Sequence, residues 1–181
     1  MVLPVQFLMA AVLITAAAAL IDWRTGHIPN GLTLGPLAVA PLLHAILAFR
    51  EQGITAAGMA FGWSALGAIA CGIAPLLIWL ANGGGGGDLK LMAALGALLG
   101  PMVGLEAETY MFVGATLYSM AWMAYRGQLL RTLGNTMMLV VNPFLPKEKR
   151  RELPEAMMTK LRFGPSIFAG TCLAAYLNWR A

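Results

Sequence analysis

The chain has 181 residues, of which 59% are hydrophobic and only 11% are charged. Soluble domains carry roughly 25% charged residues, so the composition excludes an ordinary soluble protein. The mean hydropathy of +0.73 agrees with this exclusion. The net charge of +4 does not indicate a nucleic-acid partner, because membrane topology explains the basic residues better.

Continuous apolar runs predict an all-α polytopic membrane protein, because about 20 apolar residues cross a bilayer as a helix. We expect about six transmembrane helices in a single integral-membrane domain covering residues 1–181. Only Glu106 and Glu108 mark the boundary between the fourth and fifth. In chain order the predicted spans are Leu3–Ile21, Gly31–Phe49, Ala56–Ala81, Lys90–Leu105, Ala107–Tyr125 and Phe163–Trp179.

The first apolar run ends at Asp22. A carboxylate at the edge of a hydrophobic span is costly to hold there, so it suggests a functional site. Pro29 then stops helix propagation and favours a turn that returns the chain to the membrane at Gly31. The alternative is a surface carboxylate that pairs with Arg24 at the level of the lipid headgroups.

A run of five glycines at residues 83–87 precedes the second unusual acid, Asp88. Glycines are poor helix interior, so we expect the fourth helix to start near Asp88, which can cap it. Capping alone explains the acid but not the length of the run. Because they lack side chains, Gly85, Gly86 and Gly87 are expected to let a substrate backbone approach Asp88.

The basic residues gather on one side of the predicted membrane, the side on which Asp22 and Asp88 also lie. This asymmetry follows the positive-inside rule, so that side is expected to be cytoplasmic and both termini to face outward. The cytoplasmic set is Arg24, Lys90, Arg126, Arg131, Lys147, Lys149, Arg150, Arg151, Lys160 and Arg162, against Arg50 and Arg180 on the other side.

Most of these charges fall in one long connection, residues 126–162. We expect a basic cytoplasmic or interfacial loop that sets the topology and attracts anionic lipid. The alternative is a docking surface for a partly acidic segment of a substrate.

Two carboxylates at neighbouring helix ends can share one proton, because their mutual repulsion disfavours ionising both. One protonated and one ionised carboxylate is the pair with which an aspartic protease activates water. The sequence offers no serine–histidine or cysteine–histidine pair near these helix ends, and neither Cys71 nor Cys172 belongs to a Cys-x-x-Cys motif. We therefore expect hydrolysis without a metal or another cofactor.

Three segments together resemble the type IV prepilin peptidase family. Residues 85–88 fit the Gly-x-Gly-Asp signature of membrane aspartyl proteases and continue into Leu89-Lys90-Leu91. Residues 162–167 are similar to the aromatic-Gly-Pro start of the last helix in that family. Its Asp-x-Arg…Ile-Pro-Asn segment is matched by Asp22, Arg24, Ile28, Pro29 and Asn30.

The resemblance implies that Asp22 and Asp88 are the catalytic acids. The reaction implied is removal of a short basic leader from prepilin or pseudopilin precursors at the cytoplasmic face of the bacterial inner membrane. Membrane lipid and the pilus or secretion assembly machinery are further partners implied. The residues expected to bind substrate or shape the site are Gly85, Gly86, Gly87, Lys90, Arg24, Pro29 and Asn30.

The short chain resembles the short peptidases of tight-adherence (Flp-type) pilus systems more than the longer members of the family. It lacks the zinc-binding cytosolic insertion of longer relatives, so a methyltransferase role is not implied. Three alternatives remain open. A presenilin-like or preflagellin peptidase shares the Gly-x-Gly-Asp logic. A small proton-coupled transporter would place its acids near the bilayer midplane. An assembly scaffold would use them only as helix caps.

Overall fold

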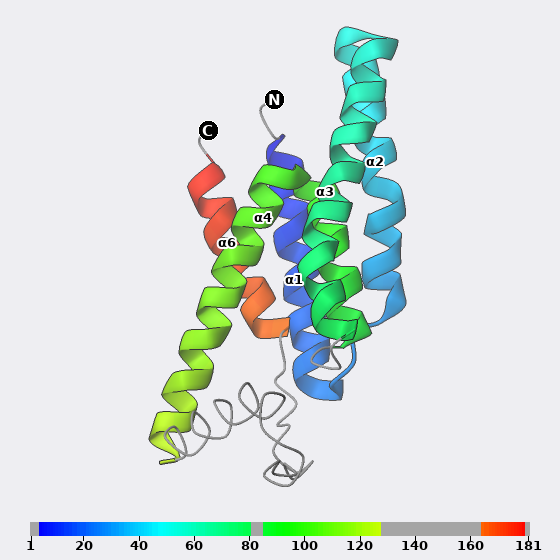
Figure 1. Ribbon diagram of the computed structural model, residues 1–181. Coiled ribbons are helices and arrows are strands. Elements are labelled where there is room, and N and C mark those ends of the chain that lie inside the picture. Colours follow the sequence, from blue (N-terminus) through cyan, green and yellow to red (C-terminus); the bar gives the residue numbers. More distant parts are fainter. Residues whose placement is uncertain (1–3, 81–84, 128–163, 180–181) are drawn as a thin grey trace, which may run out of the picture. The chain divides into compact units, whose positions relative to one another are not determined.

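The computed structural model describes residues 4–80, 85–127 and 164–179, and every regular element in these ranges is an α-helix. The all-α prediction is therefore confirmed for the described part of the chain. The predicted basic loop lies outside it, except for Arg126 and Gly127. The helices are α1 (Val5–Thr25), α2 (Asn30–Gln52), α3 (Ile54–Leu80), α4 (Gly86–Tyr125) and α6 (Gly164–Asn178) (Figure 1).

The chain divides into two compact units, residues 1–114 with 162–181, and residues 115–161. The first unit holds α1, α2, α3, the larger part of α4 and α6, together with both acids. The described part of the second unit is the end of α4 and the turn after it. The prediction of one domain over residues 1–181 is not tested by this division and stays a prediction.

Among the residues that the structure describes, four helices, α1 to α4, are long enough and apolar enough to cross a membrane. The described part of α6 has only 15 residues, fewer than the roughly 20 that a bilayer requires. The predicted number of six spans is therefore not confirmed, although membrane-like helices are.

The chain reverses inside α4, at Gly100 and Pro101. Gly100 has φ 73° and ψ 174°, a conformation that only glycine adopts readily. Gly104 consequently lies against Gly96: a Cβ on Gly104 would be 3.1 Å from the Cα of Gly96. An uninterrupted helix would separate these two residues by about 12 Å. We call residues 86–99 the first arm of α4 and residues 101–125 the second.

This reversal corrects the predicted boundary between the fourth and fifth spans. The sequence placed it at Glu106 and Glu108, whereas both glutamates lie inside the second arm. The Gly-Pro pair breaks the helix because glycine adopts the reversed dihedral and proline lacks the N–H that would continue the hydrogen bonding. The Gly-Pro pair, and not the two charged residues, therefore locates the boundary between the two helical segments.

Side chains of α2 and α3 bind the carbonyl groups that the reversal exposes. Pro101 has no N–H for the carbonyl of Ala97, which instead accepts a hydrogen bond of 2.6 Å from Ser64 Oγ. The Nε2 atom of His44 lies 3.0 Å from the carbonyl oxygen of Leu98. In a membrane each unpaired carbonyl costs several kcal/mol, so these two bonds fix the end of the first arm.

Helix α3 turns small residues toward α4 and carries large apolar side chains on its exposed face. The backbones of α3 and α4 are in contact at Gly67 and Gly96. A Cβ on either glycine would overlap the backbone of the other helix. Leu66, Ile69 and Leu77 on α3 are exposed. Close approach through small residues and outward apolar side chains are typical of helices packed within lipid.

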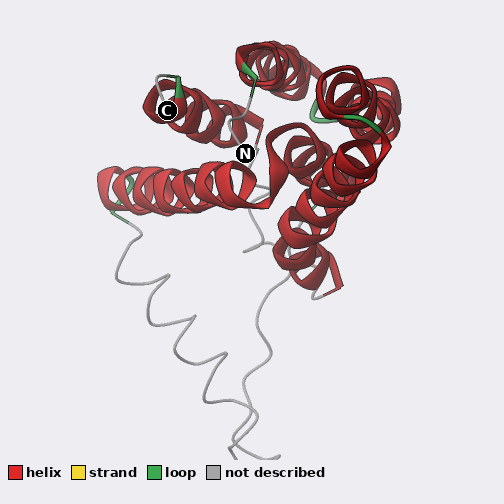
Figure 2. Ribbon diagram, turned by 90° about the horizontal axis from the view of Figure 1, so that it is seen from above, coloured by secondary structure: helices red, strands yellow, loops and turns green. Residues whose placement is uncertain are grey.

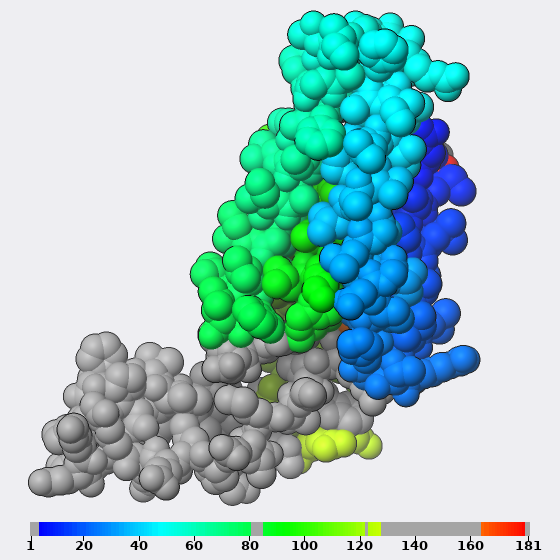
Figure 3. Space-filling view, turned by 90° about the vertical axis from the view of Figure 1, so that its right-hand side faces the viewer, coloured from blue at the N-terminus to red at the C-terminus, as the bar shows by residue number. Residues whose placement is uncertain are grey.

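The first arm of α4 is the centre of this unit, because nearly all its side chains from Leu91 to Leu99 are buried. Around it, α1 packs along α6 and α2 along α3. Figure 2 shows the helices from above, with the two ends of the chain marked. The joined ends of α2 and α3 extend beyond the other helices (Figure 3). At the opposite end of the bundle, the last turn of α1 and the first turn of α4 lie close together (Figure 1).

Candidate active site

Asp22 lies in the last turn of α1 and is only 7% exposed. Gly26 ends the helix with φ 67°, and its N–H donates to the carbonyl of Asp22 at 2.8 Å. The Asp22 carboxylate accepts a hydrogen bond of 3.2 Å from the backbone N–H of Gly164, the first residue of α6. Its burial does not fit the alternative of a surface ion pair, and within the described residues no such pair joins it to the exposed Arg24.

Asp88 lies in the first turn of α4 and is half-buried. Its carboxylate accepts a hydrogen bond from the backbone N–H of Gly85, the residue before the helix. The carbonyl of Gly85 in turn accepts the N–H of Leu89 at 3.4 Å. An acid in the first turn whose side chain accepts a hydrogen bond from the N–H of the residue before the helix, here Gly85, forms one half of a capping box. Asp88 therefore caps α4, as the sequence predicts.

The fold brings the two acids within electrostatic reach of each other, since the negative charge of Asp22 acts on Asp88. They come from opposite ends of their helices, Asp22 from the end of α1 and Asp88 from the start of α4. Both helix ends lie at the same end of the bundle (Figure 1). Mutual electrostatic influence is one condition for two acids to share a proton. The catalytic role of the two residues stays a prediction.

The connection between α1 and α2 packs on the first turn of α4. Pro29 precedes α2 with φ −64°, a value that its ring fixes. Beside it, Asn30 accepts a hydrogen bond of 3.0 Å from Lys90 Nζ to its Oδ1 atom. Beneath this bond Ile28 is buried against Gly87, where a Cβ would lie 3.2 Å from the Cβ of Ile28. Four of the predicted site residues thus meet next to Asp88.

Gly87 has a role that the sequence did not indicate. Its missing side chain makes room for Ile28 of the same chain, so close approach of a substrate is not needed to explain this glycine. At Gly86 a side chain would meet only ordinary van der Waals contact, because a Cβ there would lie 3.8 Å from Trp79 Nε1. Gly85 is exposed beside the Asp88 carboxylate. The expectation of substrate approach now rests on Gly85 and Gly86.

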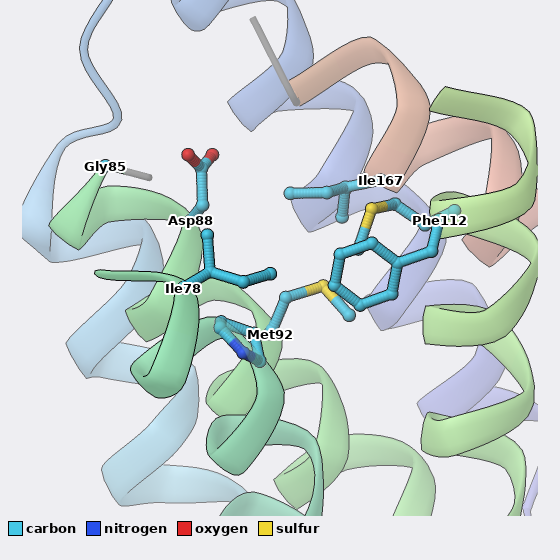
Figure 4. A pocket seen from close by; sticks show the side chains of 8 residues that line it. Ile78, Gly85, Asp88, Met92, Phe112 and Ile167 are labelled. Atoms are coloured by element: carbon cyan, nitrogen blue, oxygen red, sulfur yellow. The ribbon is translucent and has the colours of Figure 1, made fainter. Parts of the chain in front are cut away.

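An apolar pocket opens beside Asp88 (Figure 4). The close view shows the Asp88 carboxyl group at one end, pointing away from Met92 and Phe112. The wall opposite is formed by side chains of α3, the two arms of α4, and α6. The pocket is small and apolar, with one carboxyl group at its edge. The lining residues are Pro75, Ile78, Gly85, Asp88, Met92, Met111, Phe112 and Ile167.

Sequence reasoning missed Gly164 as part of this site. A Cβ on Gly164 would lie 2.7 Å from Asp22 Oδ2, so the residue contacts the acid directly. The available signal was a glycine directly before Pro165, at the start of the last apolar run. The pocket lining was also missed, because its residues come from three helices and share no local pattern.

Within residues 4–80, 85–127 and 164–179, no group of three or more His, Cys, Asp or Glu side chains is placed to hold a metal ion. The prediction of hydrolysis without a cofactor continues to rest on the chemistry of the two acids.

A comparison with protein-family models identifies the family. The model of the type IV leader peptidase family matches residues 7–127, more than half of the chain. The chain belongs to the type IV leader peptidase family. Membership implies a peptidase and confirms the resemblance seen in the sequence. Neither the comparison with curated proteins nor that with solved structures gave a match.

The matched range includes both acids of this leader peptidase family member, the connection between α1 and α2, and the glycine run. It ends before α6, so Gly164 and the pocket residue Ile167 lie beyond it. The site observed here therefore contains more of the chain than the family match covers.

Proposed function

We propose that the protein is a membrane-embedded aspartic endopeptidase that removes the short basic leader from prepilin-like precursors. The observation that supports this most directly is the pair of carboxylates, Asp22 and Asp88, within electrostatic reach of each other in a leader peptidase fold. The proposal adds the aspartic mechanism and the substrate class to what family membership implies.

The reaction follows from one proton shared by the two acids. The ionised carboxylate takes a proton from water while the water oxygen attacks the carbonyl carbon of the scissile peptide bond. The protonated carboxyl group donates its proton to the carbonyl oxygen, which gives a neutral tetrahedral intermediate. As the C–N bond breaks, the acid that took the water proton donates it to the departing nitrogen. The other carboxylate takes a proton from a hydroxyl group of the intermediate, which restores the shared-proton pair. No covalent bond to the enzyme forms.

The surroundings of Asp88 suit a substrate that changes from polar to apolar at the cleavage point. Gly85 is exposed beside the carboxylate and adds no side chain that would keep a peptide backbone away. Below it, the pocket offers Met92, Phe112 and Ile167 to an apolar side chain.

The orientation of the protein follows from its charges. The end of the bundle that carries Asp22 and Asp88 is the side predicted to hold ten of the 12 Lys and Arg residues. The positive-inside rule makes that side cytoplasmic. We infer that the protein is a multi-pass protein of the bacterial inner membrane and meets its substrate at the cytoplasmic face.

The position of the acids argues against a proton-coupled transporter. Asp22 lies three residues before the end of α1, and Asp88 two residues after the start of α4. A proton relay would place such acids near the bilayer midplane. A scaffold that uses the acids only as caps accounts for Asp88, but not for the buried Asp22 carboxylate bound by α6.

Cleavage of a prepilin precursor by the purified protein in lipid nanodiscs tests the proposal. Mass spectrometry of the product should show a new N-terminus directly after the leader. Asp22→Asn and Asp88→Asn should each abolish cleavage, because an amide keeps the size but cannot exchange the shared proton. Glu51→Gln is the matched control, since Glu51 is exposed at the far end of α2. Substantial cleavage by either aspartate variant would rule out the mechanism.

A further inference from the structure

Gly164 is the first residue of α6, and its backbone binds an acid 142 positions earlier in the chain. The hydrogen bond from Gly164 N–H to Asp22 Oδ2 measures 3.2 Å and is buried. Within the described part of the chain it is the only hydrogen bond to the Asp22 carboxylate. The family match, residues 7–127, does not include its donor.

The site needs glycine at this position for space. A Cβ on Gly164 would lie 2.7 Å from Oδ2, 2.9 Å from Cβ and 3.1 Å from Cγ of Asp22. Any larger residue must therefore displace the carboxyl group or the start of α6. The close approach of helix and acid is possible because no side chain stands between them.

The contact also supplies a favourable electrostatic environment for Asp22. The carboxylate lies at the C-terminal end of α1, where the helix dipole disfavours negative charge. The N-terminal end of α6 meets it with a free N–H and the opposite end of a dipole. The dipole at the start of α6 therefore offsets the unfavourable effect of the α1 dipole on the negative charge of Asp22.

The other charged groups nearby do not replace this contact. Asp88 faces Asp22 from α4 and repels its charge. From α2, Asn30 is engaged with Lys90, while Arg24 and His27 are exposed at the end of α1 and after it. The titratable residues described on α6, Cys172 and Tyr176, lie more than two helical turns beyond Gly164.

We propose that Gly164 is a positioning residue of the active site. Its N–H and its lack of a side chain hold the Asp22 carboxylate in the orientation in which it acts with Asp88. Docking of α6 along α1 therefore completes the site, beyond the part of the chain that the family match covers. This inference rests on the proposed function.

Gly170 provides a matched control on the same helix. A Cβ there would lie 2.6 Å from the carbonyl oxygen of Ala107 and 2.6 Å from the backbone nitrogen of Met111. Gly170→Ala therefore strains the packing of α6 on α4 as severely as Gly164→Ala strains its contact with Asp22. It does so more than one helical turn away from the acid.

The experiment compares the two alanine variants with the wild type in the leader-cleavage assay, with kcat and KM measured separately. Gly164→Ala should lower kcat by about 10- to 100-fold, because small misplacement of a reacting group has effects of that size. KM should change by less than about 3-fold, since substrate binding is not altered. Gly170→Ala should lower thermal stability and reduce kcat by less than about 3-fold, because its strained contact lies away from the acid.

Pro165→Gly is a second variant that adds no atom near Asp22 and only loosens the start of α6. It should lower kcat less and again leave KM within about 3-fold of the wild type, and it carries the test if Gly164→Ala does not accumulate in membranes. Wild-type kcat in the variant that accumulates would overturn the inference, as would an equal fall in kcat in Gly170→Ala. Absence of cleavage by the wild type would instead overturn the proposed function, and this inference with it.

Discussion

Lys90 and Asn30 are joined by a hydrogen bond of 3.0 Å between Nζ and Oδ1, although 60 positions separate them in the chain. Directly beneath, Ile28 packs on Gly87. These two contacts attach the connection after α1 to the first turn of α4. Since that connection follows Asp22 and that turn carries Asp88, they set how closely the two acids approach. We expect this attachment to matter more for activity than for stability.

Removing the polar contact should lower the cleavage rate without unfolding the protein. Lys90→Ala and Asn30→Ala should each reduce kcat by about 3- to 10-fold, which corresponds to the 0.5–1.5 kcal/mol of an ordinary hydrogen bond. The double variant should be no slower than the slower single variant, because both changes break one interaction. Additive losses in kcat would show that the two residues act separately.

The apolar contact predicts a penalty for any side chain at residue 87. Gly87→Val should lose most activity, because even the first added carbon would lie 3.2 Å from Ile28 and would push the connection away from α4. Gly35→Ala is the control: a Cβ there meets nothing within 4 Å, and the residue lies inside α2. That change should be neutral or stabilise the helix by up to about 1 kcal/mol. Wild-type cleavage rates in Gly87→Val would show that the contact with Ile28 does not position the site.

The membrane orientation is open to a labelling test at two exposed residues. Arg24 lies at the end of the bundle that carries the acids, and Glu51 lies at the far end of α2. In a background in which Cys71 and Cys172 are replaced, Arg24→Cys should react with a membrane-impermeant reagent from the cytoplasmic side. Glu51→Cys should react only from the outside. The reverse pattern would place the acids on the wrong side for leader removal.

How much of the site the sequence revealed depends on how local each signal is. Asp22 and Asp88 stand out because each interrupts an apolar run, and the turn at Pro29 follows from the chemistry of one residue. The docking of Asn30 on Lys90 and of Gly164 on Asp22 joins distant segments, so no local pattern encodes either partner. The resemblance to a family indicated which residues belong to the site, and the structure shows which of them are in contact.

The fold shows the same division. Apolar length located α1, α2 and α3 to within a few residues, because a helix in a membrane must be about that long. The predicted boundary between the fourth and fifth spans lay at the charged residues Glu106 and Glu108. The chain reverses earlier, at Gly100, because glycine and proline break the helix there. Both of these glutamates lie within the second arm of α4, where their surroundings differ sharply.

These two acids give opposite predictions for stability. Both carboxyl oxygens of Glu108 are buried, and in the described part of the chain neither has a hydrogen-bond partner. Glu106 accepts hydrogen bonds from Tyr110 Oη at 2.7 Å and from Asn178 Nδ2 at 2.9 Å, the second of which ties α4 to α6. An unpaired buried polar group costs about 1–3 kcal/mol, whereas a satisfied one contributes to stability.

Glu108→Met should therefore raise the thermal unfolding temperature of the protein in detergent or nanodiscs, because methionine has similar volume and needs no partner. Glu106→Met should lower it, since Tyr110 and Asn178 would each lose an acceptor. The same substitution two positions apart thus controls for the general effect of replacing a glutamate in this arm. A lower unfolding temperature in Glu108→Met would show that this carboxyl group has a stabilising partner in the membrane-embedded protein.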